Sequence, residues 1–151
     1  MTAPTPMRPE YAHDPEPPAA EPFIDLRRVR LGSSYARWDY AKRLLWRWVN
    51  ATVFRLPTPP KWYWQSRLLR WFGGDCRGQV KPSARVWHPW LLVLDDATTL
   101  GEHTTVYNLA PVRVGRHTVI SQHVYLCSGT HDYLTHDFEL VRDERARITI
   151  G

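Results

Sequence analysis

The run VRVGRHTVISQHVYL, from Val112 to Leu126, decides the fold, because an aliphatic residue returns in it at every sixth position. Val114, Ile120 and Leu126 carry this repeat, which extends over the stretch from Val80 to Gly151. A helix repeats every 3.6 residues and a half-buried strand every two. A sustained spacing of six is typical of hexapeptide repeats, in which each hexad supplies a short strand and a corner of a parallel β-helix.

Two longer steps interrupt the repeat, because Val86 and Leu94 are eight residues apart, and so are Val106 and Val114. If the coils stack, three faces follow: Leu94, Val114 and Ile150 share the first, Leu100 and Ile120 the second, and Val106 and Leu126 the third. The extra residues then fall at one corner of a three-sided prism, as residues 87–91, 107–111 and 127–147. Repeat proteins often carry their functional site on such insertions, so we expect a site at this corner.

The composition sets broad limits on the function. The 151 residues suffice for one ordinary domain, and a net charge of +5 favours anionic partners. Two cysteines indicate no disulfide framework, which favours a reducing compartment. The sequence shows neither an apolar run long enough to cross a membrane nor the hydrophobic core of a signal peptide. We therefore expect a cytoplasmic protein that can act at the inner membrane surface.

The chain is predicted to have three parts. Residues 1–33 form a proline-rich tail, either a disordered leader or a tether. Residues 34–74 form a helical lead rich in tryptophan and arginine, with helices expected at 34–54 and 62–72. Residues 75–151 form a partial left-handed parallel β-helix, which makes the fold an all-β solenoid preceded by two short α-helices.

The helical lead allows two interpretations. On a helical wheel the apolar side of the first helix contains Trp38, Leu45, Trp48 and Val49. Basic residues and tryptophans alternate over residues 37–72, a chemistry that suits peripheral contact with an anionic membrane surface. The interpretation we favour is that the helices cap the open end of the solenoid, which needs a cap, with their basic heads solvated. No nucleic-acid-binding module accompanies these residues, so nucleic acid is not expected as a partner.

The candidate for chemistry is His131, in the run LCSGTHDY from Leu126 to Tyr133. A neutral imidazole can remove a proton from a hydroxyl near neutral pH, and Asp132 could orient the ring. Taken alone, a histidine in a polar loop can also be merely solvated. His117 and His123 lie on successive faces of the prism and do not converge, so no metal site is expected within one chain.

Four runs together resemble the colanic acid biosynthesis acetyltransferase (WcaF-like) family of hexapeptide-repeat O-acetyltransferases. They are WHPW at 87–90, YNLAPV at 107–112, VISQ at 119–122 and YLCSGTHD at 125–132. The lead segment LLRWFG at 68–73 also matches the family's usual opening, so the likeness covers roughly residues 35–151. The resemblance implies an enzyme of exopolysaccharide biosynthesis in which His131 is the catalytic base.

The resemblance also implies the partners and the other site residues. Acetyl-CoA would be the donor, as a co-substrate rather than a bound cofactor, and a sugar or lipid-linked sugar would be the acceptor. The family forms homotrimers with active sites between subunits. Asn108, Tyr107, Trp90 and Asp132 are the expected substrate-binding residues, although Asn108 could instead bond its own loop and both aromatics could serve as corner packing.

The family continues beyond the point that corresponds to Gly151, with further coils that form most of its acetyl-CoA groove. We therefore expect either a truncated fragment of an enzyme or a remnant without full activity. The alternative function is a non-catalytic β-helix that binds another subunit or a membrane surface.

Overall fold

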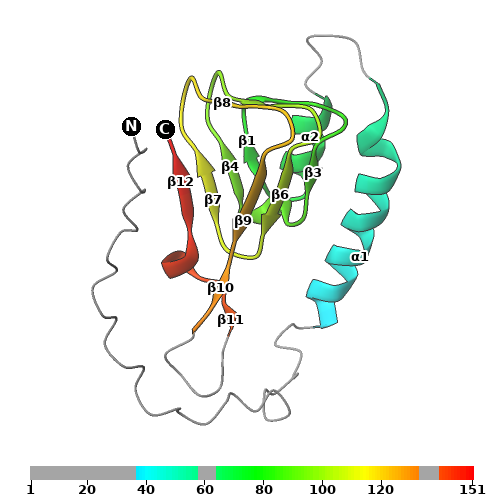
Figure 1. Ribbon diagram of the computed structural model, residues 1–151. Helices are drawn as coiled ribbons and strands as arrows, with labels where there is room; N and C mark the ends of the chain where they lie inside the picture. The colour runs from blue at the N-terminus through cyan, green and yellow to red at the C-terminus, as the bar shows by residue number, and fades with distance from the viewer. Residues whose placement is uncertain (1–36, 58–63, 133–139) are drawn as a thin grey trace, which may run out of the picture.

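The computed structural model describes residues 37–57, 64–132 and 140–151. Within them, helices come first and short strands follow, stacked in three parallel sheets (Figure 1). The helices are α1 (Arg37–Ala51) and α2 (Trp64–Trp71), and 3-10 turns lie at η1 (Val53–Arg55), η2 (Pro89–Leu91) and η3 (Glu144–Ala146). Both lead helices were predicted, although Ser34 and Trp62 of the expected ranges, like the predicted tail, lie outside the described residues.

The strands are short and follow the hexad spacing. The first sheet contains β1 (Asp75–Cys76), β4 (Leu92–Leu94), β7 (Val112–Val114) and β12 (Ile148–Ile150). The second contains β2 (Gln79–Val80), β5 (Thr99–Leu100) and β8 (Val119–Ile120), and the third β3 (Arg85–Val86), β6 (Thr105–Asn108) and β9 (Tyr125–Ser128). An antiparallel ribbon of β10 (Thr130–His131) and β11 (Leu140–Val141) extends from the third sheet (Figure 1).

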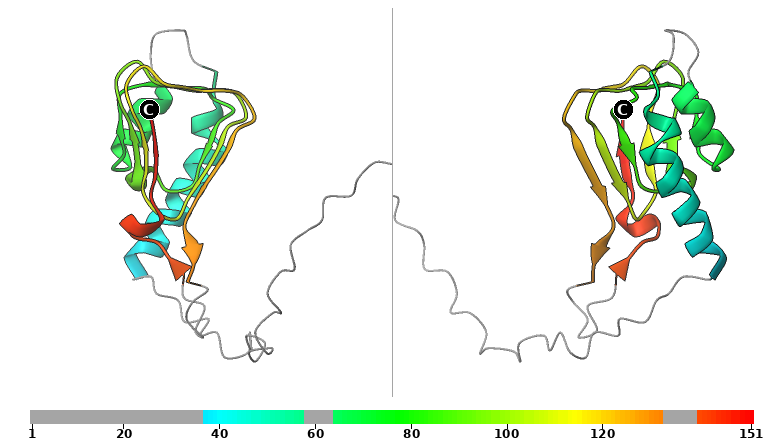
Figure 2. Two further views of the ribbon diagram at one scale, coloured as in Figure 1. Left: turned by 60° about the vertical axis from the view of Figure 1, so that its left-hand side comes forward. Right: turned by 90° about the vertical axis from the view of Figure 1, so that its right-hand side faces the viewer.

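The predicted register is confirmed in all three sheets. Val114 pairs with Leu94 and Ile150, Leu100 with Ile120, and Val106 with Leu126. The left view in Figure 2 shows the coils enclosing a triangular outline. The stacking of short parallel strands in three sheets is consistent with a β-helix, while its left-handed sense stays a prediction.

The turns between strands explain the regular placement of the histidines. Ala97, His103, His117 and His123 each lie three residues after an inward aliphatic residue, and each has a φ between 56° and 59°. Histidine tolerates this left-handed conformation better than β-branched residues do. These histidines are therefore turn residues, and the rings of His103 and His123 stack with centroids 4.9 Å apart. In the described part of the chain, no three His, Cys, Asp or Glu side chains gather closely enough to hold a metal.

Helix α1 is fastened to the third sheet through Trp46. Its indole Nε1 donates to the carbonyl oxygen of Val86 at 2.7 Å, and its ring lies 5.6 Å from that of Phe54. The buried residues of α1 are Trp46 and Val49, so Val49 is the one residue of the wheel's apolar side that is buried. Trp38, Leu45 and Trp48, which share the apolar side of the wheel with Val49, are 77%, 55% and 62% exposed.

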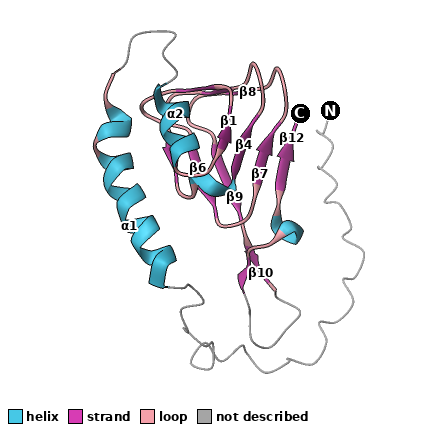
Figure 3. Cartoon of the chain, turned by 180° about the vertical axis from the view of Figure 1, so that it is seen from behind, coloured by secondary structure: helices cyan, strands magenta, loops and turns pink. Residues whose placement is uncertain are grey.

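Helix α2 covers the first coil and ends at a glycine pair, as expected (Figure 3). Gly73 adopts a φ of 93°, and the N–H of Gly74 donates to the carbonyl oxygen of Leu69 at 2.9 Å, which is a Schellman-type ending. Leu68 and Leu69 join the core that the inward aliphatic residues form. The packing thus supports the capping interpretation of the helical lead.

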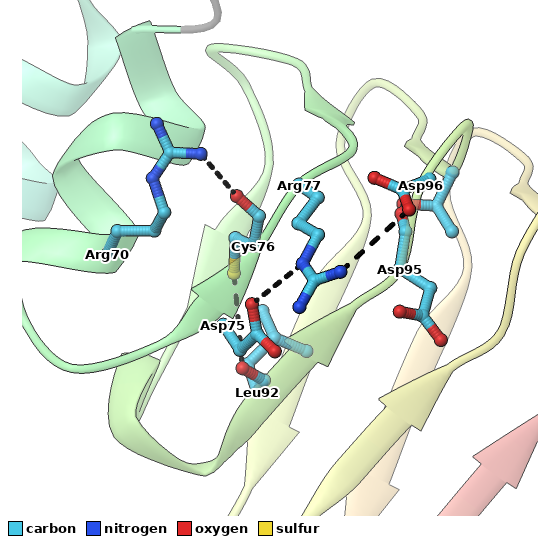
Figure 4. A network of polar contacts seen from close by, with 8 residues as sticks. Arg70, Asp75, Cys76, Arg77, Leu92, Asp95 and Asp96 are labelled. Carbon is cyan, nitrogen blue, oxygen red and sulfur yellow. Dashed lines mark hydrogen bonds and ion pairs between the residues drawn. The ribbon is translucent and has the colours of Figure 1, made fainter.

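Polar contacts also tie α2 to the first coil (Figure 4). Arg70 donates to the carbonyl oxygen of Cys76 at 3.2 Å, and Arg77 lies between Asp75 and Asp96 of the next coil, at 3.3 and 3.9 Å. The Arg77 pairs are more than half exposed, so they contribute little stability. Burial raises the pKa of the Cys76 thiol to about 12, which keeps it neutral.

Both cysteines are free thiols, Cys76 buried and Cys127 exposed. Among the described helices, none has the length and apolar character needed to cross a bilayer.

Candidate active site

The three insertions meet at one corner, between the third sheet and the first. Each follows a strand of the third sheet and precedes a strand of the first, so β3, β6 and β9 lead into loops that end at β4, β7 and β12. Because these strands are neighbours within their sheets, the loops lie at the same edge of the stack. The predicted gathering is therefore confirmed for the described residues of the insertions, and we call the place where 87–91, 107–111, 127–132 and 140–147 meet the loop corner.

Asn108 holds two coils together inside the loop corner. The side chain is fully buried, its Oδ1 accepts from the backbone N–H of His88 at 2.9 Å, and its Nδ2 donates to the carbonyl oxygen of His88 at 2.7 Å. The backbone carbonyl oxygen of Asn108 also lies 2.6 Å from Nδ1 of His88. Asn108 thus bonds the loop backbone of the preceding coil rather than that of its own loop, while contact with an acceptor stays a prediction.

Ser128 repeats this arrangement one coil further on. Its buried hydroxyl donates to the carbonyl oxygen of Ala110 at 2.6 Å and accepts from the N–H of the same residue at 3.3 Å. His88, Asn108 and Ser128 are thus spaced by twenty residues and lie at the same place in successive coils. Sequence reasoning missed His88 and Ser128, although this spacing around Asn108 was a signal that could have found them.

His88 is held as a neutral ring. It is buried, and burial lowers the pKa of its imidazole more than the hydrogen bond to Asn108 raises it, with Arg43 and Arg142 lowering it further. Since a carbonyl oxygen can only accept, Nδ1 carries the proton in that hydrogen bond. His88 therefore serves as a rigid, uncharged element of the loop corner.

His131 leaves the coil on the antiparallel ribbon. The chain turns outward at Gly129, whose φ is 99° and whose missing Cβ would lie 2.7 Å from Cβ of Leu109, so only glycine fits there. His131 then pairs with Leu140 and is exposed, while Asp132 is half-buried. The imidazole is thus exposed on the ribbon beside the loop corner.

Tyr107 belongs to a row of aromatic rings on the outer face of the third sheet. Because strand residues alternate, Tyr107 faces outward where its neighbour Asn108 faces inward. The Trp87 ring meets the Tyr107 ring edge to face at 4.6 Å, and the Tyr125 ring stacks on Tyr107 at 6.5 Å. Such a row gives flat, partly exposed surfaces of the kind on which sugar rings can stack.

Trp90 lies at the junction between the loop corner and α1. The Lys42 ammonium is 4.2 Å from the centroid of its ring, and the His88 ring is 5.2 Å away. Trp90 lines a cavity of about 170 Å³ together with Arg43 of α1 and Arg142, which follows β11. The structure therefore gathers the expected loops but distributes their side chains: Asn108 inside, Tyr107 on the sheet, Trp90 against α1, and His131 and Asp132 on the ribbon.

Comparison with known proteins identifies two relatives, from Escherichia coli (strain K12) and from Shigella flexneri. Each is described as "Putative colanic acid biosynthesis acetyltransferase WcaF" and is 37% identical over 118 residues. The matched part covers 77% of this chain and 65% of each relative, so the chain spans just under two thirds of their length. No protein-family profile matches the chain, and no solved structure matches it significantly. The family resemblance expected from the motifs is thereby confirmed: the chain is homologous to these two relatives.

Proposed function

We propose that the protein acts as an O-acetyltransferase that moves an acetyl group from acetyl-CoA to a sugar hydroxyl during exopolysaccharide biosynthesis. The observation that carries the proposal is the 37% identity to relatives named as acetyltransferases, combined with the exposed position of His131 at the loop corner. The acceptor is a sugar or a lipid-linked sugar of the colanic acid type, and acetyl-CoA is a co-substrate.

His131 acts as the general base in this proposal. Its neutral imidazole takes the proton of the acceptor hydroxyl while the hydroxyl oxygen attacks the thioester carbonyl. The C–O bond forms, the C–S bond breaks, and CoA leaves as a thiolate that takes up a proton. Backbone N–H groups near the site would stabilise the oxyanion.

The other site residues take different parts. Tyr107, within its aromatic row, offers a ring face to the sugar, and Asp132 is available to orient His131 or to bind a sugar hydroxyl. Asn108 acts through the loop backbone that it fixes. Trp90, which carries Lys42 over its ring, supports the position of α1.

The direct test is release of CoA from acetyl-CoA in the presence of a sugar acceptor. We expect His131→Ala to lower kcat about 10²- to 10⁴-fold, the usual contribution of a general base. His117→Asn is the matched control, because it changes an exposed histidine in a turn whose left-handed φ asparagine also adopts. Equal rates for wild type and His131→Ala would remove His131 from the mechanism.

We also propose that the active protein is a homotrimer with its sites between subunits, as the family resemblance implies. Sedimentation equilibrium should then give three times the chain mass of 17.7 kDa. A monomer that retains full activity would contradict this arrangement.

A second candidate function is contact with an anionic membrane surface, and the outer face of α1 favours it. Trp38, Leu44 and Trp48 are more than 60% exposed, and the exposed Arg37 directly precedes Trp38. Indole rings and cations together suit the headgroup region of acidic lipid. Co-sedimentation with vesicles should decrease in Trp38→Ala and Trp48→Ala, and binding that is independent of acidic lipid would refute the idea.

A further inference from the structure

A cavity of about 490 Å³ lies where α1, η1 and β3 meet, away from the ribbon that carries His131. Three arginines line it, Arg47 from α1, Arg55 from η1 and Arg85 from β3, together with Asn50 and Trp87. These arginines come from three separate segments of the chain, so their convergence is a product of the fold.

The three guanidinium groups have no anionic partner among the described residues. In the part of the chain that the structure describes, no carboxylate forms an ion pair with Arg47, Arg55 or Arg85. The wall of the same cavity also includes Asn50, whose buried Oδ1 has no hydrogen-bond partner among the described residues. A cavity with converging cations and an unsatisfied amide is suited to an anionic ligand.

Each arginine is fixed next to a buried anchor. Arg47 follows Trp46, Arg55 follows Phe54 and Arg85 precedes Val86, and these three anchors are at most 1% exposed. Trp46 touches both of the others, through its edge-to-face contact with Phe54 at 5.6 Å and its hydrogen bond to Val86 at 2.7 Å. The backbone positions of the three arginines are therefore set before any ligand binds.

The chemistry of the cavity selects the ligand class. Guanidinium groups bind phosphate oxygens through paired hydrogen bonds, and three of them favour a ligand with more than one negative charge. The volume exceeds what a single phosphate needs and falls in the range of sites for small organic ligands. Trp87, which is 48% exposed and braced edge to face by Tyr107, adds an aromatic surface at the rim.

We propose that this arginine cavity binds the diphosphate group of an organic ligand. The shared chemistry is a diphosphate, which a soluble nucleotide or a lipid headgroup can supply. The three arginines and Asn50 have no part in the proposed acetyl transfer, so the site can be tested separately from it; Trp87 at the rim is the one residue that also belongs to the aromatic row of Tyr107.

Isothermal titration calorimetry with inorganic pyrophosphate tests the site, with chloride at equal ionic strength as the reference. We expect saturable binding to the wild type and a Kd about tenfold higher or more in Arg47→Gln and Arg85→Gln. Arg113→Gln is the matched control, because Arg113 is also an exposed, outward-facing strand residue but lies on β7 of the first sheet. No saturable heat up to about 10 mM pyrophosphate, or equal weakening by Arg113→Gln, would overturn the proposal.

A second measurement does not depend on the variants folding. In protein with ¹⁵N-labelled arginine, pyrophosphate should shift the Nε–H signals of Arg47, Arg55 and Arg85 and leave that of Arg113 in place. Uniform shifts of all four signals would show general screening and overturn the site.

Vesicles of phosphatidylcholine with and without diacylglycerol pyrophosphate, whose headgroup is a diphosphate, then separate the two sources. Release of the protein from acidic vesicles by pyrophosphate would support the site with a lipid headgroup as its ligand. Vesicle binding that pyrophosphate does not disturb, alongside intact pyrophosphate titration, would support the site with a soluble diphosphate.

Discussion

The amide of Asn108 spans two neighbouring coils, accepting from the N–H of His88 and donating to its carbonyl oxygen. Sequence alone places an asparagine near His131 but does not say which way it faces. The direction follows from the alternation along β6, in which Val106 and Asn108 face inward and Tyr107 faces outward. The inward direction makes Asn108 a structural residue of the loop corner.

Replacement of Asn108 by alanine should destabilise the protein strongly. The change leaves the buried backbone N–H and C=O of His88 without their side-chain partners, so we expect the free energy of unfolding to fall by about 2–4 kcal/mol. Urea denaturation measures it, with Arg113→Ala on the exposed face of β7 as the control. A loss below about 0.5 kcal/mol would show that these hydrogen bonds add nothing.

His88 should make stability depend on pH. Its pKa in the folded protein lies below its ordinary value of 6.5, chiefly because of burial. Between 6.5 and that lowered pKa the unfolded chain binds a proton that the folded chain does not, so stability decreases as the pH falls through this range. Urea midpoints measured from about pH 7.5 to about pH 5.5 should fall more steeply in the wild type than in His88→Gln. Equal slopes would contradict the buried, neutral ring.

At the scale of single elements, α1 shows where sequence patterns stop being informative. The helix carries tryptophans on two sides, and a hydrophobicity wheel gives no reason to choose the side that packs. The choice is made by contacts of Trp46 with Phe54, with Phe72 and with the backbone of Val86, and the last two lie outside the helix and far away in sequence. The strands were easier to predict, because the spacing of six is a property of the local sequence alone.

Mutations on the two faces of α1 should differ strongly in their effect on the free energy of unfolding. We expect Trp46→Ala to lower the free energy of unfolding by about 3–5 kcal/mol, since a large buried ring and its hydrogen bond are lost. Trp48→Ala, at a site that is 62% exposed, should change it by less than about 0.5 kcal/mol. Thermal or urea unfolding compares the pair, and a larger effect at Trp48 would mean that the helix packs through its other side.

At the scale of the whole molecule, the six-residue repeat predicts more than the element pattern. It gives the register of three sheets and the corner at which all insertions meet, because both follow from counting residues between inward aliphatic positions. It does not predict how far each side chain stands from the others within that corner. Those positions depend on Gly129, which directs His131 onto the ribbon, and on the contact of Trp90 with Lys42 of α1.

The molecule has two separate polar regions. One is the exposed ribbon with His131, and the other is the arginine cavity beneath α1. Figure 2 shows the ribbon projecting below the coils, while α1 runs along their side. A catalytic group and an anion site can therefore be altered independently by mutation.

The most direct test of the proposed acetyl transfer uses acetyl-CoA labelled with ¹³C in the acetyl group. With a colanic-acid-type sugar acceptor, we expect a ¹³C signal of an O-acetyl ester to grow with the wild-type protein and to be lost, within detection, with His131→Ala. An ester signal that grows equally with both proteins would contradict the role of His131, and its absence with the wild type would contradict the transfer itself.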